Sequence, residues 1–293
     1  RKCYDEGSKW VSPHFIPSMI SNIASGNIAI KYEACGVCLP IVTACATGTH
    51  SIGEAYRAIK HGYADAIIAG GTESAINQLG IAGFANCKAL SRAEDPALAS
   101  LPFDKRRQGF VIAEGAGVVL LEEYEHAKAR NAVIYAEVCG YANTCDGHHV
   151  TAPHPEGTHA ARAIRMALEE ANFNHDDVLH INTHGTGTPL NDVSETAAIK
   201  LALGEDIARK ALINSTKSMT GHLLGAAGGV EVIAAALALY NGIVPPTISL
   251  DEPDEACDLN YTPKVAQKAD LTVAISESLG FGGHNSCVAL RKI

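Results

Sequence analysis

Short β-branched runs alternate with helical patterns along most of the chain, and this alternation predicts an α/β fold with mixed or parallel sheets. We expect strands over eight ranges: residues 37–43, 66–70, 117–121, 134–142, 178–182, 211–214, 271–276 and 286–290.

Three helices are expected between these strands. The first follows Cys45 and ends near Gly62, and the second covers about 158–171. The third begins near His222, ends near Tyr240 and is apolar on nearly all sides, so it should be buried. Residues 91–107 and 244–263 are rich in turn formers and are expected to be surface loops.

A faint internal repeat predicts two similar halves, residues 1–131 and 132–293. In each half a helix, a loop and a strand lead to a Gly-Phe pair, Gly109-Phe110 in the first and Gly280-Phe281 in the second, and then to another strand. The second half has more strands and helices ahead of its loop, whereas the first has only 36 residues before its first strand. We therefore expect that an N-terminal β/α portion of the first half is absent from the chain.

Composition argues against several classes of protein. The net charge of −9 has no compensating basic tract, which argues against nucleic-acid binding. The longest uninterrupted apolar run, residues 232–240, has nine residues, far short of the ~20 that span a bilayer. With no leader visible, we expect no membrane segment and a cytoplasmic location. The nine cysteines are scattered along the chain without a regular spacing, so we expect free thiols. Cys35 and Cys38 form a lone CxxC pair, and without a second pair of ligands they predict no metal site.

Cys45 lies where an apolar run meets the N-terminus of an amphipathic helix. Free backbone N–H groups and a partial positive charge gather at such a terminus. We therefore predict that the thiol is shifted towards thiolate, below its free pKa of about 8.5. The alternative is a buried structural thiol, which is a common fate of cysteine.

Two Gly- and Thr-rich loops each carry a histidine after a predicted strand, namely His184 and His222. The strand ends of α/β sheets are where such folds place their sites. One candidate nucleophile and two imidazoles together predict covalent acyl chemistry. A purely structural role is the alternative, and it is the expected role of most of the thirteen histidines.

Seven motifs occur in the order found in condensing enzymes of the thiolase fold. Along essentially its whole length the chain resembles the elongating β-ketoacyl-[acyl-carrier-protein] synthase II family of bacterial fatty acid synthesis. This resemblance implies a layered αβαβα fold built from two similar halves. The motifs are Thr43-Ala44-Cys45, Ala69-Gly70-Gly71-Thr72-Glu73, Pro102-Phe103-Asp104-Lys105 through Gly109-Phe110-Val111, Glu114-Gly115-Ala116-Gly117, His184-Gly185-Thr186-Gly187-Thr188, Lys217-Ser218-Met219-Thr220-Gly221-His222 and Gly280-Phe281-Gly282-Gly283.

The resemblance implies a decarboxylating Claisen condensation in fatty acid elongation, which makes a 3-oxoacyl carrier protein. Cys45 would attack an acyl thioester and hold the chain as an acyl-enzyme. His184 and His222 would bind the malonyl thioester carbonyl and favour loss of CO₂. Donors aimed at the enolate oxygen stabilise it, and removing one such donor typically costs ~10²–10³ in rate.

The resemblance also implies an oxyanion hole made by the backbone N–H groups of Cys45 and Phe281. Phe281 would gate the acyl pocket, with Gly280, Gly282 and Gly283 as flexible joints. The alternative for these glycines is a tight turn that needs positive φ.

Contacts with an acyl carrier protein follow from the same resemblance. Thr186 and Thr188 would hydrogen-bond its 4′-phosphopantetheine arm, or else satisfy the backbone of their turn. The carrier is acidic, so docking needs a local basic patch, to which Lys9 and Lys88 would belong unless they are ordinary solvated lysines. A homodimer is implied, and no cofactor is required beyond the carried thioester.

Glu231 interrupts an otherwise apolar helix, and a buried carboxylate needs a partner. Lys217, in the loop leading into that helix, is the nearest reasonable candidate. We expect the two to form a pair that orders the loop bearing His222. A solvated Glu231 on an exposed helix face is the alternative.

The chain departs from the family pattern at three positions. His284 stands where the family usually has Thr, Glu277 where it usually has Asn, and Gly187 where Ser is common. These departures leave the Cys–His–His set unchanged and fall on the gate segment and the pantetheine loop.

Three other functions are weighed against this one. A polyketide ketosynthase shares the same Cys–His–His set. A non-catalytic chain-length partner subunit typically lacks the nucleophile, which Cys45 provides here. A thiolase needs a second cysteine as acid–base, and the Gly280-Phe281-Gly282-Gly283 segment offers none.

Overall fold

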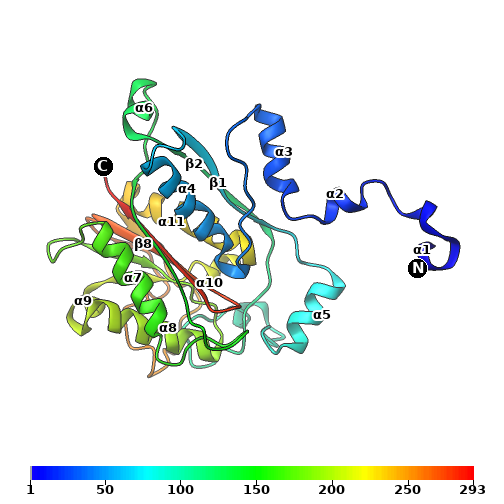
Figure 1. The fold of residues 1–293 in the computed structure, drawn as a ribbon. Coiled ribbons are helices and arrows are strands. Elements are labelled where there is room, and N and C mark those ends of the chain that lie inside the picture. Colours follow the sequence, from blue (N-terminus) through cyan, green and yellow to red (C-terminus); the bar gives the residue numbers. More distant parts are fainter. Residues whose placement is uncertain (1) are drawn as a thin grey trace. The chain divides into compact units, whose positions relative to one another are not determined.

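The structure, a computed structural model, describes residues 2–293, and the chain divides into two compact units at Val42–Thr43. The first unit contains only short helices, and none of its described side chains is fully buried. The helices are α1 (Lys2–Glu6), the 3-10 turn η1 (Ser8–Trp10), α2 (Phe15–Met19) and α3 (Ile23–Tyr32). The second unit, Thr43–Ile293, contains every strand of the described residues (Figure 1).

The expected strand over residues 37–43 is wrong. These residues form no strand, and Val37, Leu39 and Val42 expose 77%, 73% and 68% of their surface. A strand is stabilised by N–H···O bonds to a neighbour, and no strand of the described chain pairs with this run. Cys35 before this run and Cys38 within it are exposed as well.

A mixed five-stranded sheet forms the centre of the second unit, which confirms the α/β class. Its order is β3 (Glu137–Cys145), β9 (His284–Arg291), β8 (Val273–Gly280), β4 (Leu179–Asn182) and β5 (Leu212–Asn214). Strand β4 runs parallel to β5 and β8, whereas β9 runs antiparallel to β3 and β8.

Two smaller antiparallel pairs complete the strands. They are β1 (Ala66–Glu73) with β2 (Gly115–Glu122), and β6 (Ile243–Val244) with β7 (Gln267–Lys268). Seven of the eight expected strands therefore exist, with ends shifted by a few residues. The division into halves 1–131 and 132–293 stays a prediction.

Helices cover the five-stranded sheet on both faces (Figure 1). On one face α4 (Thr47–Lys60) and α11 (Ala227–Asn241) pack between this sheet and the β1–β2 pair. On the other face α7 (Thr158–Glu170) and α8 (Pro189–Leu203) enclose a second apolar core. The remaining helices and 3-10 turns are η2 (Ala44–Ala46), α5 (Gln78–Asn86), η3 (Pro96–Leu98), α6 (Tyr124–Ala129), α9 (Glu205–Lys210), α10 (Lys217–Thr220) and η4 (Leu224–Ala226).

Glycines allow the backbones of the middle layer to approach closely. A Cβ on Gly48 of α4 would lie 2.5 Å from the Gly229 nitrogen of α11, and one on Gly229 would lie 2.1 Å from the Gly117 oxygen of β2. Real Cβ atoms do not tolerate such distances, so the helix that follows Cys45 packs on the helix that follows His222 only because these positions lack a side chain.

The two expected surface loops are only partly exposed. Leu101 and Phe103 in the first loop are buried, as are Leu250 and Tyr261 in the second. The rings of Phe103 and Tyr261 stack with their centroids 3.7 Å apart. Turn-forming residues predicted the irregular backbone correctly, but the aromatic and aliphatic side chains between them fill the core under α8.

The expected buried helix is α11. The stretch Leu224–Asn241 has the length and mean hydropathy, 1.4, that would also let a helix cross a membrane, but 61% of it is buried within the fold. The core helix of a globular domain passes the same test, so the stretch is explained by its place between the two sheets.

Substitutions on α8 test the core. Ile199 is fully buried and Leu201 is 49% exposed. Ile199→Ala should lower the free energy of unfolding by about 2–5 kcal/mol because it removes buried methyl groups and leaves a cavity. Leu201→Ala, the control, should cost less than about 1 kcal/mol. Urea unfolding measures both, and equal losses would contradict this packing.

Candidate active site

Cys45 is the middle residue of the turn η2, which ends directly before the first residue of α4, and it is 8% exposed. Ala44 ahead of it has φ 50°, a left-handed conformation that is uncommon for a residue with a side chain. The end of β8 passes close to this turn, because a Cβ on Gly280 would lie 2.8 Å from the Thr43 oxygen. Cys45 and the Gly-Phe-Gly-Gly segment are therefore brought together.

The thiol is not shifted towards thiolate, and this expectation is wrong. Burial raises the pKa of Cys45 to about 11. The Lys217 charge and hydrogen bonds from the backbone N–H groups of Phe281 and Cys45 lower this pKa by less than burial raises it. Desolvation disfavours the charged form of a group, and here it exceeds the effect of the helix terminus.

His222 is a neutral imidazole that can donate from Nε2. It is 1% exposed, and burial lowers its pKa well below the usual value. Its Nδ1 accepts the backbone N–H of Leu224 at 3.3 Å, so the single ring proton resides on Nε2. The ring packs edge-on against Phe110, with centroids 5.0 Å apart.

His184 is held in the same tautomer by a different partner. Its Nδ1 lies 3.4 Å from the Lys217 Nζ, and an ammonium group only donates, so Nδ1 accepts and Nε2 holds the proton. Burial and then the charge of Lys217 lower the pKa of His184 well below its usual value. Its ring stands at 86° to that of His222, with centroids 5.2 Å apart.

These side chains share one buried region. Cys45 packs with Phe110 and Leu224 in one apolar cluster, and Phe110 contacts His222, which in turn contacts His184. One sulfur and two Nε2–H donors thus lie in one environment, built from η2, the β4–α8 loop and the loop before α11.

Lys217 and Glu231 form an ion pair between α10 and α11, with side chains only 1% and 2% exposed. Burial raises the pKa of Glu231, and the Lys217 charge opposes that rise. Since Lys217 also contacts His184, the pair links α11 to both histidine loops.

The Gly-Phe-Gly-Gly segment forms a tight turn between β8 and β9. Gly282 and Gly283 have φ of 90° and 77°, values that favour glycine, so the turn that needs positive φ is present. The Gly282 N–H donates to the Val150 oxygen at 2.7 Å. Phe281 faces Phe84 of α5 at 6.5 Å between ring centroids.

The hydroxyls of Thr186 and Thr188 lie 2.9 Å apart, and Thr188 precedes the first residue of α8. Lys9 lies in the first unit and Lys88, just after α5, lies in the second. Both lysines are exposed.

Two acidic residues of α8 were missed by sequence reasoning. The fully buried Glu195 accepts the backbone N–H groups of His184 at 2.5 Å and Gly185 at 2.8 Å. Asp192 accepts those of Phe103 at 2.8 Å and Gly187 at 3.2 Å. Acidic residues near a helix N-terminus usually look like solvated dipole partners, so only their burial reveals that they hold loops.

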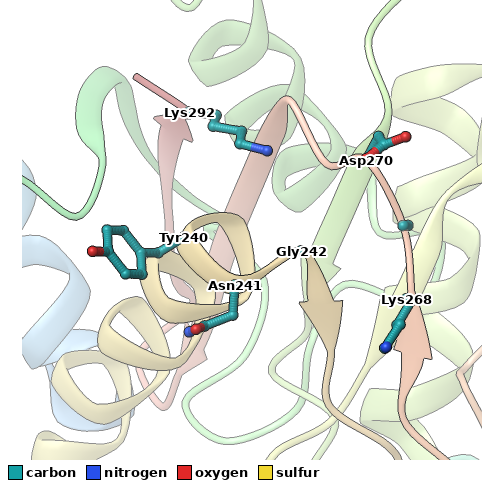
Figure 2. A pocket seen from close by; sticks show the side chains of 7 residues that line it. Tyr240, Asn241, Gly242, Lys268, Asp270 and Lys292 are labelled. Carbon is teal, nitrogen blue, oxygen red and sulfur yellow. The ribbon is translucent and has the colours of Figure 1, made fainter.

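The pocket at the end of α11 is formed by other residues than this set. Figure 2 shows a pocket at the end of α11, lined by Tyr240, Asn241, Lys268 and Lys292 among others, and neither Cys45 nor either histidine lines it. Among the described residues no group of three His, Cys, Asp or Glu side chains could hold a metal ion.

Alkylation tests the state of the thiol. Because the pKa of Cys45 is raised to about 11, its reaction with iodoacetamide should be slow at pH 8 and accelerate steadily up to pH 10. The exposed Cys87 should react first at pH 8. Peptide mass spectrometry after timed quenching measures both rates, and a Cys45 rate that levels off below pH 9 would contradict the effect of burial.

Removing one member of the ion pair tests its energetics. Lys217→Met should lower the free energy of unfolding by about 3–5 kcal/mol, because it leaves Glu231 buried and unpaired. The double variant with Glu231→Gln should recover much of that loss. Lys264→Met is the control, since Lys264 and Asp251 are 57% and 44% exposed and such pairs contribute about 0–1 kcal/mol.

Known proteins resemble this chain over nearly its whole length. The family model described as "Beta-ketoacyl synthase, N-terminal domain" matches residues 1–127, and "Beta-ketoacyl synthase, C-terminal domain" matches residues 135–251. The 3-oxoacyl-[acyl-carrier-protein] synthase 2 of Synechocystis sp. is 52% identical over 98% of this chain and 69% of its own length. The protein of the same name from Vibrio harveyi is 49% identical over 99% of this chain and 70% of its own.

Among solved structures, a chain of a type II polyketide acyl carrier protein in complex with its ketosynthase is similar, with a TM-score of 0.94 and 39% identity. That match covers 97% of this chain and 70% of the other. The chain belongs to the β-ketoacyl synthase family.

Proposed function

We propose that this protein joins malonyl-[acyl-carrier-protein] to an acyl chain held on Cys45, by decarboxylating Claisen condensation, and so makes 3-oxoacyl-[acyl-carrier-protein] in fatty acid elongation. The observation that carries this proposal is a pair of neutral imidazoles, each with its proton on Nε2, in the same buried region as one thiol. Relatives named 3-oxoacyl-[acyl-carrier-protein] synthase 2, 52% and 49% identical, support the substrate class.

Acyl transfer comes first. The Cys45 sulfur attacks the acyl thioester, a new C–S bond forms, and the C–S bond to pantetheine breaks. Because the Cys45 thiol is protonated before attack, its proton passes to the departing pantetheine sulfur. The N–H groups of Cys45 and Phe281, both directed at the sulfur, would stabilise the oxyanion next to it.

Decarboxylation and condensation follow. The carbon–carbon bond to the malonyl carboxylate breaks, CO₂ leaves, and the electron pair develops an enolate. The Nε2–H groups of His184 and His222 stabilise the enolate oxygen as donors. The carbanion attacks the acyl-Cys45 carbonyl, the Cys45 C–S bond breaks, and the thiolate takes up a proton from solvent.

Partners and conditions are part of the same proposal. Thr186 and Thr188 hold the pantetheine arm, Lys9 and Lys88 contribute to docking the acidic carrier, and Phe281 with Gly282 gates the acyl pocket. The protein acts as a cytoplasmic homodimer and uses no cofactor beyond the carried thioester. The similar structure that contains an acyl carrier protein with its ketosynthase supports the choice of partner.

The alternatives have less support. Polyketide ketosynthases share the Cys–His–His set, but the similar polyketide structure is 39% identical, against 52% for the synthase from Synechocystis sp.. A non-catalytic chain-length subunit has no need of a thiol in contact with the oxyanion donors, which Cys45 has here.

Separate assays of the two half-reactions test the proposal. His222→Ala should reduce malonyl decarboxylation by about 10²–10³ because one enolate donor is lost, while acyl transfer to Cys45 remains largely intact. Release of labelled CO₂ and mass spectrometry of acyl-Cys45 measure the two steps. His126→Ala, at a side chain that is 53% exposed, is the control. Equal loss of both steps would contradict the assigned role.

A further inference from the structure

We propose that Arg107 is a positioning residue for the pantetheine arm: its guanidinium group fixes the threonine turn, residues 186–189, which presents the Thr186 and Thr188 hydroxyls. This inference rests on the proposed function, in which those hydroxyls hold the arm. Arg107 is the last residue of the turn-rich segment 91–107, yet its side chain is only 5% exposed. An arginine is almost never buried unless it is paired, so its partners indicate its role.

Hydrogen bonds to backbone and side-chain acceptors hold the guanidinium group of Arg107. Its Nε donates to the Thr188 backbone oxygen at 3.3 Å, and its Nη2 donates to the Pro189 backbone oxygen at 3.2 Å. Its Nη1 donates to the Asp104 backbone oxygen at 3.0 Å and to the Asp254 carboxylate at 2.6 Å. The rigid fork of an arginine can donate in several directions at once, whereas the single nitrogen of a lysine is a point donor. Arg107 therefore joins the start of α8 to both turn-rich segments.

The threonine turn is also held through the backbone of Gly187. The Gly187 N–H donates to the Asp192 carboxylate at 3.2 Å, and the Gly187 oxygen accepts the Gly109 N–H at 3.0 Å. Thr188 follows directly, and its hydroxyl lies 2.9 Å from that of Thr186. With Gly187 held by these bonds and the next two carbonyl groups held by the guanidinium group, the backbone fixes where the two hydroxyls stand.

Stabilisation of α8 does not explain the place of Arg107. A helix N-terminus carries a partial positive charge, which disfavours a cation beside it. The carboxylates of Asp192 and Asp254, 3.6 Å and 2.6 Å from guanidinium nitrogens, offset the charge of Arg107. What the cation contributes at this terminus is a set of donors for the carbonyl groups of Thr188 and Pro189.

Arg107 also begins a segment that reaches His222. Phe110 packs edge-on against the His222 ring, and the His222 N–H donates to the Val111 oxygen at 2.7 Å. The Ala113 N–H in turn donates to the His222 oxygen at 2.9 Å. This segment connects the threonine turn to one of the enolate donors. Because His222 has these contacts of its own, loss of the guanidinium fork should loosen the threonine turn and leave His222 in place.

The experiment compares decarboxylation of malonyl-pantetheine with that of the malonyl S-ethyl thioester, which lacks the arm. In Arg107→Lys the KM for malonyl-pantetheine should rise about fivefold, the effect of displacing one or two hydrogen bonds to the substrate. Its kcat, and kcat/KM for the S-ethyl thioester, should stay within about twofold of wild type. Arg106→Lys is the matched control and should follow wild type, because Arg106 is 33% exposed and pairs with the half-exposed Asp251.

A variant with both Thr186→Val and Thr188→Val measures the loss of the arm contact itself. Adding Arg107→Lys to it should raise the KM for malonyl-pantetheine no further, because Arg107 acts through those hydroxyls. Equal losses on both substrates in Arg107→Lys would overturn the positioning role. So would an unchanged KM in Arg107→Lys when the threonine variant raises it, and in both cases the proposed function stands. If the threonine variant leaves the KM unchanged, the threonines do not hold the arm and the positioning role is wrong as well.

Amide hydrogen exchange gives a readout that needs no activity. In Arg107→Lys the peptide that contains residues 186–189 should exchange faster than in the wild type and in Arg106→Lys, because the turn loses the bonds of the guanidinium fork. Unchanged exchange would overturn the proposal, whether or not the protein decarboxylates malonyl thioesters. Faster exchange in a protein that decarboxylates neither substrate would support the hold of Arg107 on the turn and contradict the proposed function.

Discussion

The site depends on the buried positive charge of Lys217. Its ammonium group pairs with Glu231 of α11 and donates to the His184 Nδ1. Since an ammonium group cannot accept a hydrogen bond, this one contact fixes the tautomer of His184 and leaves its Nε2–H as the free donor of the ring. The same charge lowers the pKa of Cys45, although burial raises it by more. One cation thereby links α11, one histidine and the nucleophile.

The strand β8 and the helix α8 hold the other side of the site. Gly280 allows β8 to pass within contact distance of the Cys45 turn, while Glu195 ties the His184 loop to α8 through two backbone N–H groups. Because the hydrogen bonds of Glu195 are already formed within the fold, the loop needs little reorganisation when substrate binds. Rigid helices and strands therefore position loops that carry the chemistry.

Local sequence patterns predicted much of the fold, and the predictions that failed have a common cause. Seven predicted strands and the buried α11 were confirmed, because periodicity reports which side chains can face a core. The run at 37–43 has the same apolar character but no neighbouring strand to accept its hydrogen bonds. In the same way Phe103 and Tyr261 sit in turn-rich segments, yet they stack in the core, because burial depends on what packs against a segment.

The sequence by itself placed one thiol and two imidazoles after predicted strands and supplied Lys217 and Glu231 near them. Only the tertiary structure decided their protonation: a thiol that keeps its proton and two neutral histidines with Nε2–H donors. The physical reason is that desolvation arises from neighbours distant in the chain, and here it exceeds the local field of a helix terminus. Spacing names the groups of a site, whereas burial sets their charges.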